Sequence, residues 1–286
     1  MKRFLALATL VATTGMLLGA GLAGASGAAD ASAGGSHLQP GGTIIKSPGT
    51  ANSALPTISY NWSGYAATSP KKFTYVHSQF VQPAITCTGH PSQYTSNWVG
   101  LDGFDDQTVE QDGTFAWCPG PSGTTAVYYA WYEMYPAGSV NVFKVQPGDV
   151  IDEAVKYTGG KFDLSIGDVT SGKHVSISRA CATCERTSAE WIIERPALCN
   201  SSFTSCYLTA LADYHTATMS QDQAQLAGGA VKGIGGFTNY QIFMVNPLKT
   251  SGFISLDAVG PVSGGGFTAT WERPGTTLPI TLGPRR

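Results

Sequence analysis

Two short segments of the chain carry side chains suited to acid–base and oxyanion chemistry. Gln111 lies in a Gln-Asp-Gly run, and Glu190 lies in the segment 189–194. Apolar and polar residues nearly alternate in the second segment, which favours a strand with Glu190, Ile192 and Glu194 on one face. A carboxylate acts as an acid or a base, whereas a glutamine amide cannot titrate but donates hydrogen bonds to a developing oxyanion. The pair narrows the chemistry to proton transfer with oxyanion stabilisation.

A motif upstream of the glutamine supplies an indole and a carboxylate. Residues 98–103 read Trp-Val-Gly-Leu-Asp-Gly, and we interpret Asp102 within them as a residue that supports the site. Trp98 is suited either to a cleft or to a core, because indoles also fill the interiors of β-sandwiches. The motif by itself leaves the place of Trp98 open.

A third segment, Trp131-Tyr132-Glu133, adds a second indole and a second carboxylate. In an extended strand Trp131 and Glu133 share one face, while Tyr132 and Met134 lie on the other. We therefore expect Trp131 and Glu133 to line a cleft. The structural alternative for them is an ordinary core indole and a solvated strand carboxylate.

Taken in order, these motifs resemble those of the glutamic peptidases (eqolisins), secreted endopeptidases that use a Gln/Glu pair. The resemblance also includes Asn61-Trp62-Ser63-Gly64-Tyr65 and the final strand-like segment 267–271, and it spans roughly residues 60 to 272. It implies that Gln111 and Glu190 are the catalytic residues and that polypeptides are the substrates. It also implies that no metal and no organic cofactor is needed.

The mechanism implied by the resemblance is attack of a water molecule held between the two catalytic side chains. Glu190 as carboxylate removes a proton from the water and passes it to the leaving amine, while Gln111 donates to the oxyanion. An unperturbed glutamate titrates near ~4.3, so activity is expected to persist well into acid. Asp112 follows the glutamine where many relatives carry threonine, and this neighbouring carboxylate is expected to alter the local field.

Other functions remain open from the residues alone. A carbohydrate-active sandwich would use Glu133 and Glu190 as acid and nucleophile, but it would leave Gln111 without a role. A non-catalytic binding sandwich would keep the scaffold without hydrolysis. No Gly-x-Ser-x-Gly elbow, His-Glu-x-x-His motif or phosphate-binding glycine loop occurs, although a Ser/His/Asp triad is assembled by folding and spacing does not exclude it.

The fold class follows from many short strand signals separated by turns. They predict an all-β sandwich of two large antiparallel sheets, of the concanavalin-like or jelly-roll type, and the resemblance implies the same. A helix is plausible only at residues 219–226. The expected strands are 126–135, a hairpin of 150–157 and 161–166 around Gly159-Gly160, and 174–178; turns are expected at 145–149 and 264–266.

The beginning of the chain carries export signals. A basic start, an apolar run over residues 4–22 and Ala-x-Ala sites predict a signal peptide at residues 1–31. Residues 32–55 are rich in Gly, Ser and Pro and are interpreted as a short propeptide or flexible leader. Residues 56–286 are then expected to form one β-sandwich peptidase domain, secreted as a monomer with no membrane association after cleavage.

Charge and composition limit the possible partners. The formal net charge of −2 indicates neither a nucleic-acid partner nor a polybasic membrane contact. Charged residues make up 13% of the chain, about half of the usual quarter. A surface of neutral polar groups depends little on ion pairs and suits an acidic environment, although many secreted sandwiches share it.

The cysteines predict disulfides rather than a metal site. Six cysteines in an exported chain are paired by default, and fifteen connectivities are possible. Pairing sequence neighbours is the first choice, and relatives in the resembling family also carry a disulfide-closed hairpin after the glutamate strand. A zinc or redox role for Cys-Ala-Thr-Cys would require a second ligand pair. The expected bonds are Cys87–Cys118, Cys181–Cys184 and Cys199–Cys206.

Overall fold

The computed structural model describes residues 37–39, 44–46, 55–89, 93–120, 125–200 and 205–280, the first two ranges and residues 55–56 as backbone alone. The chain divides into two compact units, Met1–Ala31 and Ser32–Arg286, and the following description concerns the second. The expected signal peptide lies outside the described residues and stays a prediction.

The described residues are almost entirely strand, with one 3-10 helix at Ile234–Gly236. The all-β fold predicted from the alternating patterns is therefore confirmed. Over the described ranges, the structure contains no helix long and apolar enough to cross a membrane.

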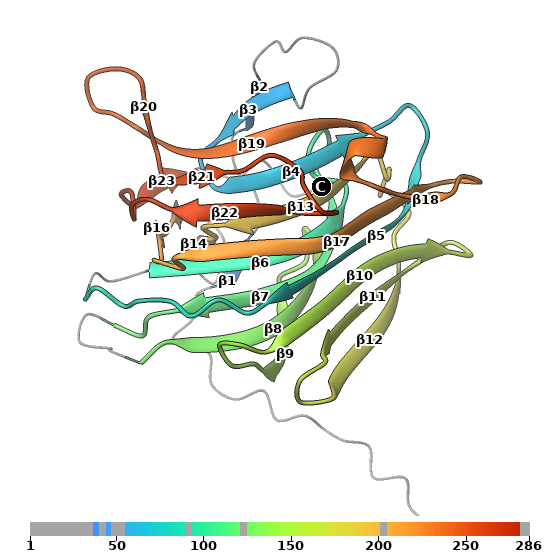
Figure 1. Cartoon of the computed structure of the whole chain (residues 1–286), viewed down its shortest axis with the longest axis horizontal. Helices are drawn as coiled ribbons and strands as arrows, with labels where there is room; N and C mark the ends of the chain where they lie inside the picture. Colours follow the sequence, from blue (N-terminus) through green and yellow to red (C-terminus); the bar gives the residue numbers. More distant parts are fainter. Residues whose placement is uncertain are drawn as a thin grey trace, which may run out of the picture. The chain divides into compact units, whose positions relative to one another are not determined.

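A larger sheet contains the segments that carry the candidate catalytic residues (Figure 1). Most of its strands pair antiparallel, and the β3–β19 and β6–β16 pairs are parallel. Its order is β2 (Ile44–Lys46), β3 (Leu55–Ser59), β19 (Thr238–Pro247), β4 (Trp62–Thr68), β13 (Ser188–Glu194), β6 (Gln93–Leu101), β7 (Val109–Trp117), β8 (Val127–Tyr135) and β9 (Val140–Lys144), with β16 (Ala210–Leu211) on β6 and β20 (Phe253–Ser255) on β19.

A second large sheet packs against one face of the first. The second sheet runs in the order β12 (Lys173–Ala180), β11 (Lys161–Asp168), β10 (Val150–Thr158), β5 (Phe73–Val81), β17 (Thr216–Leu226), β22 (Phe267–Trp271) and β21 (Asp257–Val259), with β18 (Val231–Gly233) on β17.

A small third sheet joins β1 (His37–Gln39), β14 (Ala197–Cys199), β15 (Cys206–Leu208) and β23 (Leu278–Ile280).

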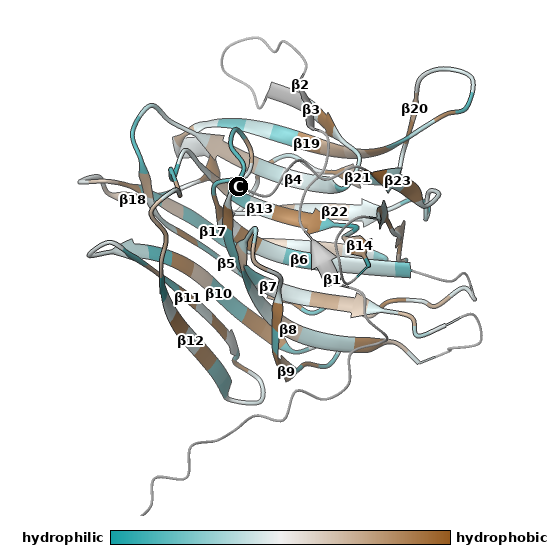
Figure 2. Cartoon of the chain, turned by 180° about the vertical axis from the view of Figure 1, so that it is seen from behind, coloured by the Kyte–Doolittle hydropathy of each residue, from teal (hydrophilic) through white to brown (hydrophobic). Residues whose placement is uncertain are grey.

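The two faces of the larger sheet carry different cores. Alternation along β13 sends Ala189, Trp191 and Ile193 into the main core between the two large sheets. Ile192 lies on the opposite face, in a separate aromatic-rich cluster that also contains Trp98. Brown and teal residues alternate along many strands in Figure 2, as expected when the two faces of a strand meet different surroundings.

The predicted strands are found, and the predicted helix is wrong. The 126–135 strand, the 150–166 hairpin and the 174–178 strand correspond to β8, β10–β11 and β12. Residues 219–226 lie within strand β17 instead of a helix. A bulge explains the error: Gln221 has a left-handed φ of 54°, and the pairing of β17 with β5 shifts between Ser220 and Gln223. The shift interrupts the two-residue period of the buried side chains.

The segment interpreted as a leader contains two short strands. β1 pairs with β14, and β2 pairs with β3 at the edge of the larger sheet. Within the 32–55 segment the described residues are these two strands and Leu55, the first residue of β3. Removal of the segment as a propeptide stays a prediction.

All three expected disulfides are present. Cys87 bonds to Cys118, Cys181 to Cys184 and Cys199 to Cys206. The first closes a loop that contains both the Trp-Val-Gly-Leu-Asp-Gly motif and Gln111. The third joins β14 to β15, just past the strand that carries Glu190.

Candidate active site

Strand pairing brings the two candidate catalytic residues into one row across the larger sheet. Glu190 of β13 pairs with Gly100 of β6, Gly100 pairs with Gln111 of β7, and Gln111 pairs with Glu133 of β8. Directly paired residues of antiparallel strands point to the same face, so the three side chains share one surface. Residues 111 and 190 are therefore neighbours across a single glycine.

Gly100 contributes no side chain to the gap between Gln111 and Glu190. Two strand spacings separate these residues, which is about 10 Å between their Cα atoms. A Cβ built on Gly100 would lie 3.2 Å from the Gln111 Cβ and 3.0 Å from Cζ3 of Trp98. The glycine therefore keeps this part of the row free of a side chain where the reacting groups would meet.

The amide of Gln111 is oriented by Glu133. Its Nε2 donates to Glu133 Oε2 at 2.7 Å, and its Oε1 has no hydrogen-bond partner among the described residues. An amide nitrogen has two hydrogens, so one donor remains for another acceptor. Glu133 and Trp131 share one strand face, as alternation predicts, and both side chains are buried. The cleft that they are expected to line stays a prediction.

Glu190 is a buried carboxyl without a hydrogen-bond partner in the described ranges. Burial raises the pKa of Glu190 well above its ordinary value, and the charges of Asp102, Asp106 and Glu110 raise it further. The unperturbed value of ~4.3, from which activity well into acid was expected, therefore does not describe Glu190 in the folded chain. Removal from water is the physical reason.

Indoles surround the row on the same face. Trp98 and Trp131 are buried in the aromatic-rich cluster, next to Trp62. Trp191 lies in the main core and donates its indole N–H to the His77 carbonyl at 2.8 Å. Apolar walls strengthen every electrostatic interaction of the carboxyl and the amide inside them.

Asp102 holds the segment that leads into the Glu190 strand. Its carboxylate accepts the backbone N–H of Glu185 at 2.8 Å and of Thr187 at 2.6 Å. Burial raises the pKa of Asp102 to about 6, with a further rise from Asp106. Asp102 therefore fixes the backbone just before β13, and its supporting role in the site stays a prediction.

Asp112 does not face the row. It alternates with Gln111 along β7 and points into the interior of the sandwich, so the expected influence of a charged neighbour on the site is not supported. Burial raises the pKa of Asp112, and that of Glu153 from the facing sheet, well above their ordinary values. Asp222 lies near Glu153, accepts the Ser78 hydroxyl at 2.7 Å, and has its pKa raised to about 7 by burial. These interior carboxyls are neutral in acid.

One group of potential metal-ligand atoms is found among the described residues. It consists of Glu110, Cys181 and Cys184. Both sulfurs belong to a disulfide and therefore offer no thiolate. The group consequently does not resemble a zinc site.

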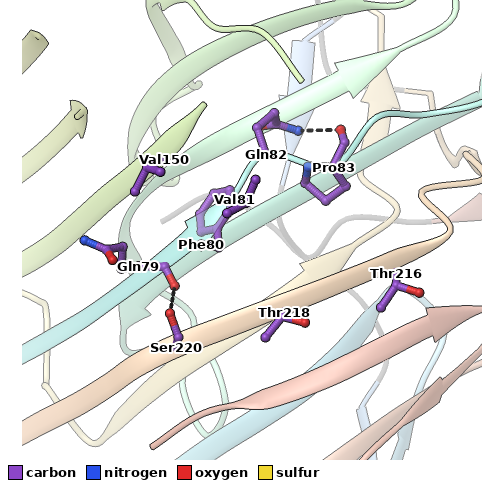
Figure 3. A pocket seen from close by; sticks show the side chains of 9 residues that line it. All are labelled: Gln79, Phe80, Val81, Gln82, Pro83, Val150, Thr216, Thr218 and Ser220. Atoms are coloured by element: carbon purple, nitrogen blue, oxygen red, sulfur yellow. Dashed lines mark hydrogen bonds between the residues drawn. The ribbon is translucent and has the colours of Figure 1, made fainter. Parts of the chain in front are cut away.

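A surface hollow of about 410 Å³ lies elsewhere, over the second large sheet (Figure 3). Its lining contains no titratable side chain, and Gln79 and Ser220 in it are joined by a hydrogen bond between the Ser220 hydroxyl and the Gln79 carbonyl. The hollow is unrelated to the row of Gln111 and Glu190, and its neutral lining offers no acid or base.

Sequence reasoning assigned no role to Gly100, Asn61 or Glu194. Asn61 and Trp98 both donate hydrogen bonds to Glu194, on the same strand face as Glu190. The alternation of Glu190 and Glu194 along one strand was a signal for this placement. The contact with Asn61 depends on residues 133 positions apart, which no local pattern predicts.

Comparison with known proteins gives one matching family. The model of the Peptidase A4 family matches residues 60–259. Scytalidopepsin B from Scytalidium lignicola is 30% identical over 184 residues, which cover 62% of this chain and 68% of that protein.

Solved structures share the fold. Scytalido-glutamic peptidase bound to a transition-state analogue inhibitor superposes with a TM-score of 0.63 and 22% identity, covering 74% of this chain and 98% of that one. Aspergilloglutamic peptidase from Aspergillus niger gives a TM-score of 0.50 and 26% identity, covering 63% and 99%. The sandwich of large antiparallel sheets is thus common to all three chains.

Proposed function

The chain belongs to the Peptidase A4 family and is a glutamic endopeptidase, and from this premise we propose that Gln111 and Glu190 are its catalytic pair. The observation that carries the proposal is the row in which both side chains share one sheet face on either side of Gly100. A water molecule above the glycine would have a proton acceptor on one side and an amide donor on the other.

The proposed reaction is hydrolysis of a peptide bond by that water. Glu190 as carboxylate takes a proton from the water while the water oxygen attacks the scissile carbonyl carbon. Gln111 donates its remaining N–H to the oxyanion of the tetrahedral intermediate. Glu190 then returns the proton to the peptide nitrogen, the C–N bond breaks, and a carboxylic acid and an amine are released.

Protonation defines the pH range of the proposed enzyme. Burial raises the pKa of Glu190, which strengthens it as a base and lowers its ionised fraction in acid. The rate should therefore fall on the acid side as Glu190 becomes protonated. On the alkaline side, ionisation of interior carboxyls such as Asp112 and Glu153 weakens the fold. The alkaline effect favours a maximum below neutrality, whereas the raised pKa of Glu190 limits how far activity extends into acid.

The carbohydrate alternative is not supported. Glu190 and Glu133 lie three strand spacings apart, about 14 Å between Cα atoms, and Gln111 stands between them in the row, where a carboxylate pair would leave it without a role. Glu133 also accepts the Gln111 amide, so its position is explained by that contact.

We propose further that the chain is secreted after removal of residues 1–31. Residues 32–55 would then be a propeptide, and residues 56–286 a monomeric domain. The three disulfides support passage through an oxidising compartment. Relatives with the same fold have been solved with peptide-based ligands, which supports polypeptide substrates.

The deciding experiment is hydrolysis of denatured casein and haemoglobin by the purified chain across acidic and neutral pH, with a polysaccharide panel in parallel. Glu190→Gln and Gln111→Ala should abolish most of the proteolysis. Glu185→Gln is a matched control, because the Glu185 side chain is exposed and has only a 3.8 Å ion pair with Lys72. Full activity in either dyad variant, or cleavage of polysaccharide alone, would overturn the assignment.

A further inference from the structure

A second carboxyl, Glu194, lies on the same strand face as Glu190 and has no part in the proposed reaction. It is four residues further along β13 and only 2% exposed. A buried carboxyl normally requires hydrogen-bond partners, and the nature of these partners shows what the group does.

Both oxygens of Glu194 accept hydrogen bonds, one from Asn61 directly before β4 and one from Trp98 of β6. Asn61 Nδ2 donates to Oε1 at 2.9 Å, and Trp98 Nε1 donates to Oε2 at 2.8 Å. Trp62 packs edge-on against the Trp98 ring, with centroids 5.1 Å apart and an interplanar angle of 78°. Within its buried cluster, the Trp98 indole thus makes a hydrogen bond to Glu194 and an edge-on contact with Trp62.

The other end of the same indole reaches the gap between the catalytic side chains. Cζ3 of Trp98, on the six-membered ring and away from Nε1, lies 3.0 Å from the position of a Cβ on Gly100. The ring thus extends from the Glu194 carboxyl to the glycine that separates Gln111 from Glu190. A rotation of the ring at its nitrogen would move this edge within the gap.

We propose that Glu194 is a positioning residue, which holds the Trp98 indole as a wall of the gap where water and the scissile carbonyl meet. The inference rests on the proposed function of Gln111 and Glu190. Glu194 acts only through Trp98, and it exchanges no proton with the substrate.

A carboxyl suits this place better than an amide. In either protonation state each carboxyl oxygen keeps a lone pair that can accept an N–H, whereas the amide nitrogen of glutamine accepts none. Burial raises the pKa of Glu194 to about 7, while the hydrogen bonds from Trp98 and Asn61 lower it. In Glu194→Gln, the new amide nitrogen is itself a donor, so it would face either Asn61 Nδ2 or Trp98 Nε1 without accepting a hydrogen bond.

The test is a double-mutant cycle with Glu194→Gln and Trp98→Phe in the full chain. Each single variant should lower kcat about 10-fold to 10²-fold per folded molecule, with KM within about twofold, because a misplaced wall disturbs the geometry of the reaction. The double variant should be no slower than the poorer single variant, since both changes break the same contact. A merely structural role would lower the unfolding midpoint and leave kcat per folded molecule unchanged.

Three outcomes would overturn the inference: an unchanged kcat in Glu194→Gln, an unchanged kcat in Trp98→Phe, or strictly additive effects. Trp98→Phe keeps an aromatic ring, so it decides the question if Glu194→Gln fails to fold. Glu190→Gln is measured alongside. If Glu190→Gln is inactive and Glu194→Gln is normal, only the positioning role fails; if Glu190→Gln is active, the proposed function itself fails.

Discussion

Replacing Gly100 by alanine tests directly whether the gap between Gln111 and Glu190 is where the reaction occurs. The new Cβ would lie 3.0 Å from Trp98 Cζ3, 3.2 Å from Gln111 Cβ and 3.2 Å from Val109 Cγ1. Optimal carbon contacts are about 3.5 to 4 Å, so each neighbour must move by a few tenths of an ångström. Gly100 does not have a left-handed φ, so the backbone itself tolerates alanine.

The expected cost differs between stability and catalysis. Overpacking by one methyl group should lower the free energy of unfolding by about 1 to 3 kcal/mol. The same displacement acts on the Gln111 side chain and on the Trp98 wall, so kcat should fall by about 10²-fold. The assay is kcat on a peptide substrate, corrected for the folded fraction from urea unfolding.

Gly235→Ala is the matched control for Gly100→Ala. A Cβ at Gly235 meets nothing within 4 Å, and its φ is not left-handed. Stability and kcat should stay unchanged in this control. If Gly100→Ala keeps kcat within about threefold of the parent while the fold is intact, the space above Gly100 is not the reaction site.

Further outcomes follow from the buried carboxyls and from the dyad. Glu190→Gln should lower kcat by about 10² to 10⁴ and Gln111→Ala by about 10² to 10³, and the double variant should scarcely exceed the poorer single one in a steady-state assay. Glu133→Gln should be milder, because it changes only the acceptor that orients Gln111; complete loss of activity there would contradict a supporting role. Burial raises the folded-state pKa of Glu153 and of Asp112 above their unfolded values, so the folded chain holds protons that the unfolded chain has already lost. The free energy of unfolding should therefore fall as the pH rises above about 4.3, where the unfolded glutamate ionises. Urea midpoints at acidic and neutral pH measure this slope, and Glu153→Gln should flatten it.

Local alternation was sufficient for the side chains that one strand places together. The shared faces of Glu190 with Ile192, and of Trp131 with Glu133, are found as predicted. The disulfides between sequence neighbours were also predictable, because each pair closes a short or moderate loop. The strand at 219–226 was missed because a bulge at Gln221 hides the two-residue period.

Local patterns could not predict the raised pKa of Glu190, nor that the Asp112 side chain is buried inside the sandwich. Whether a strand carboxyl meets water, an amide or a core depends on which elements cover it. Asp112 points into the sandwich and away from the site, and burial raises the pKa of both groups.

By itself, the sequence determined the all-β class and the residue types available for acid–base chemistry, and it made pairing of neighbouring cysteines the first choice among fifteen connectivities. Only the tertiary structure decided that residues 79 positions apart meet across one glycine. The strand order β13–β6–β7 produces that meeting, because strands distant in the chain pair through backbone hydrogen bonds that have no sequence code of their own. Their register then depends on which face of each strand can be buried.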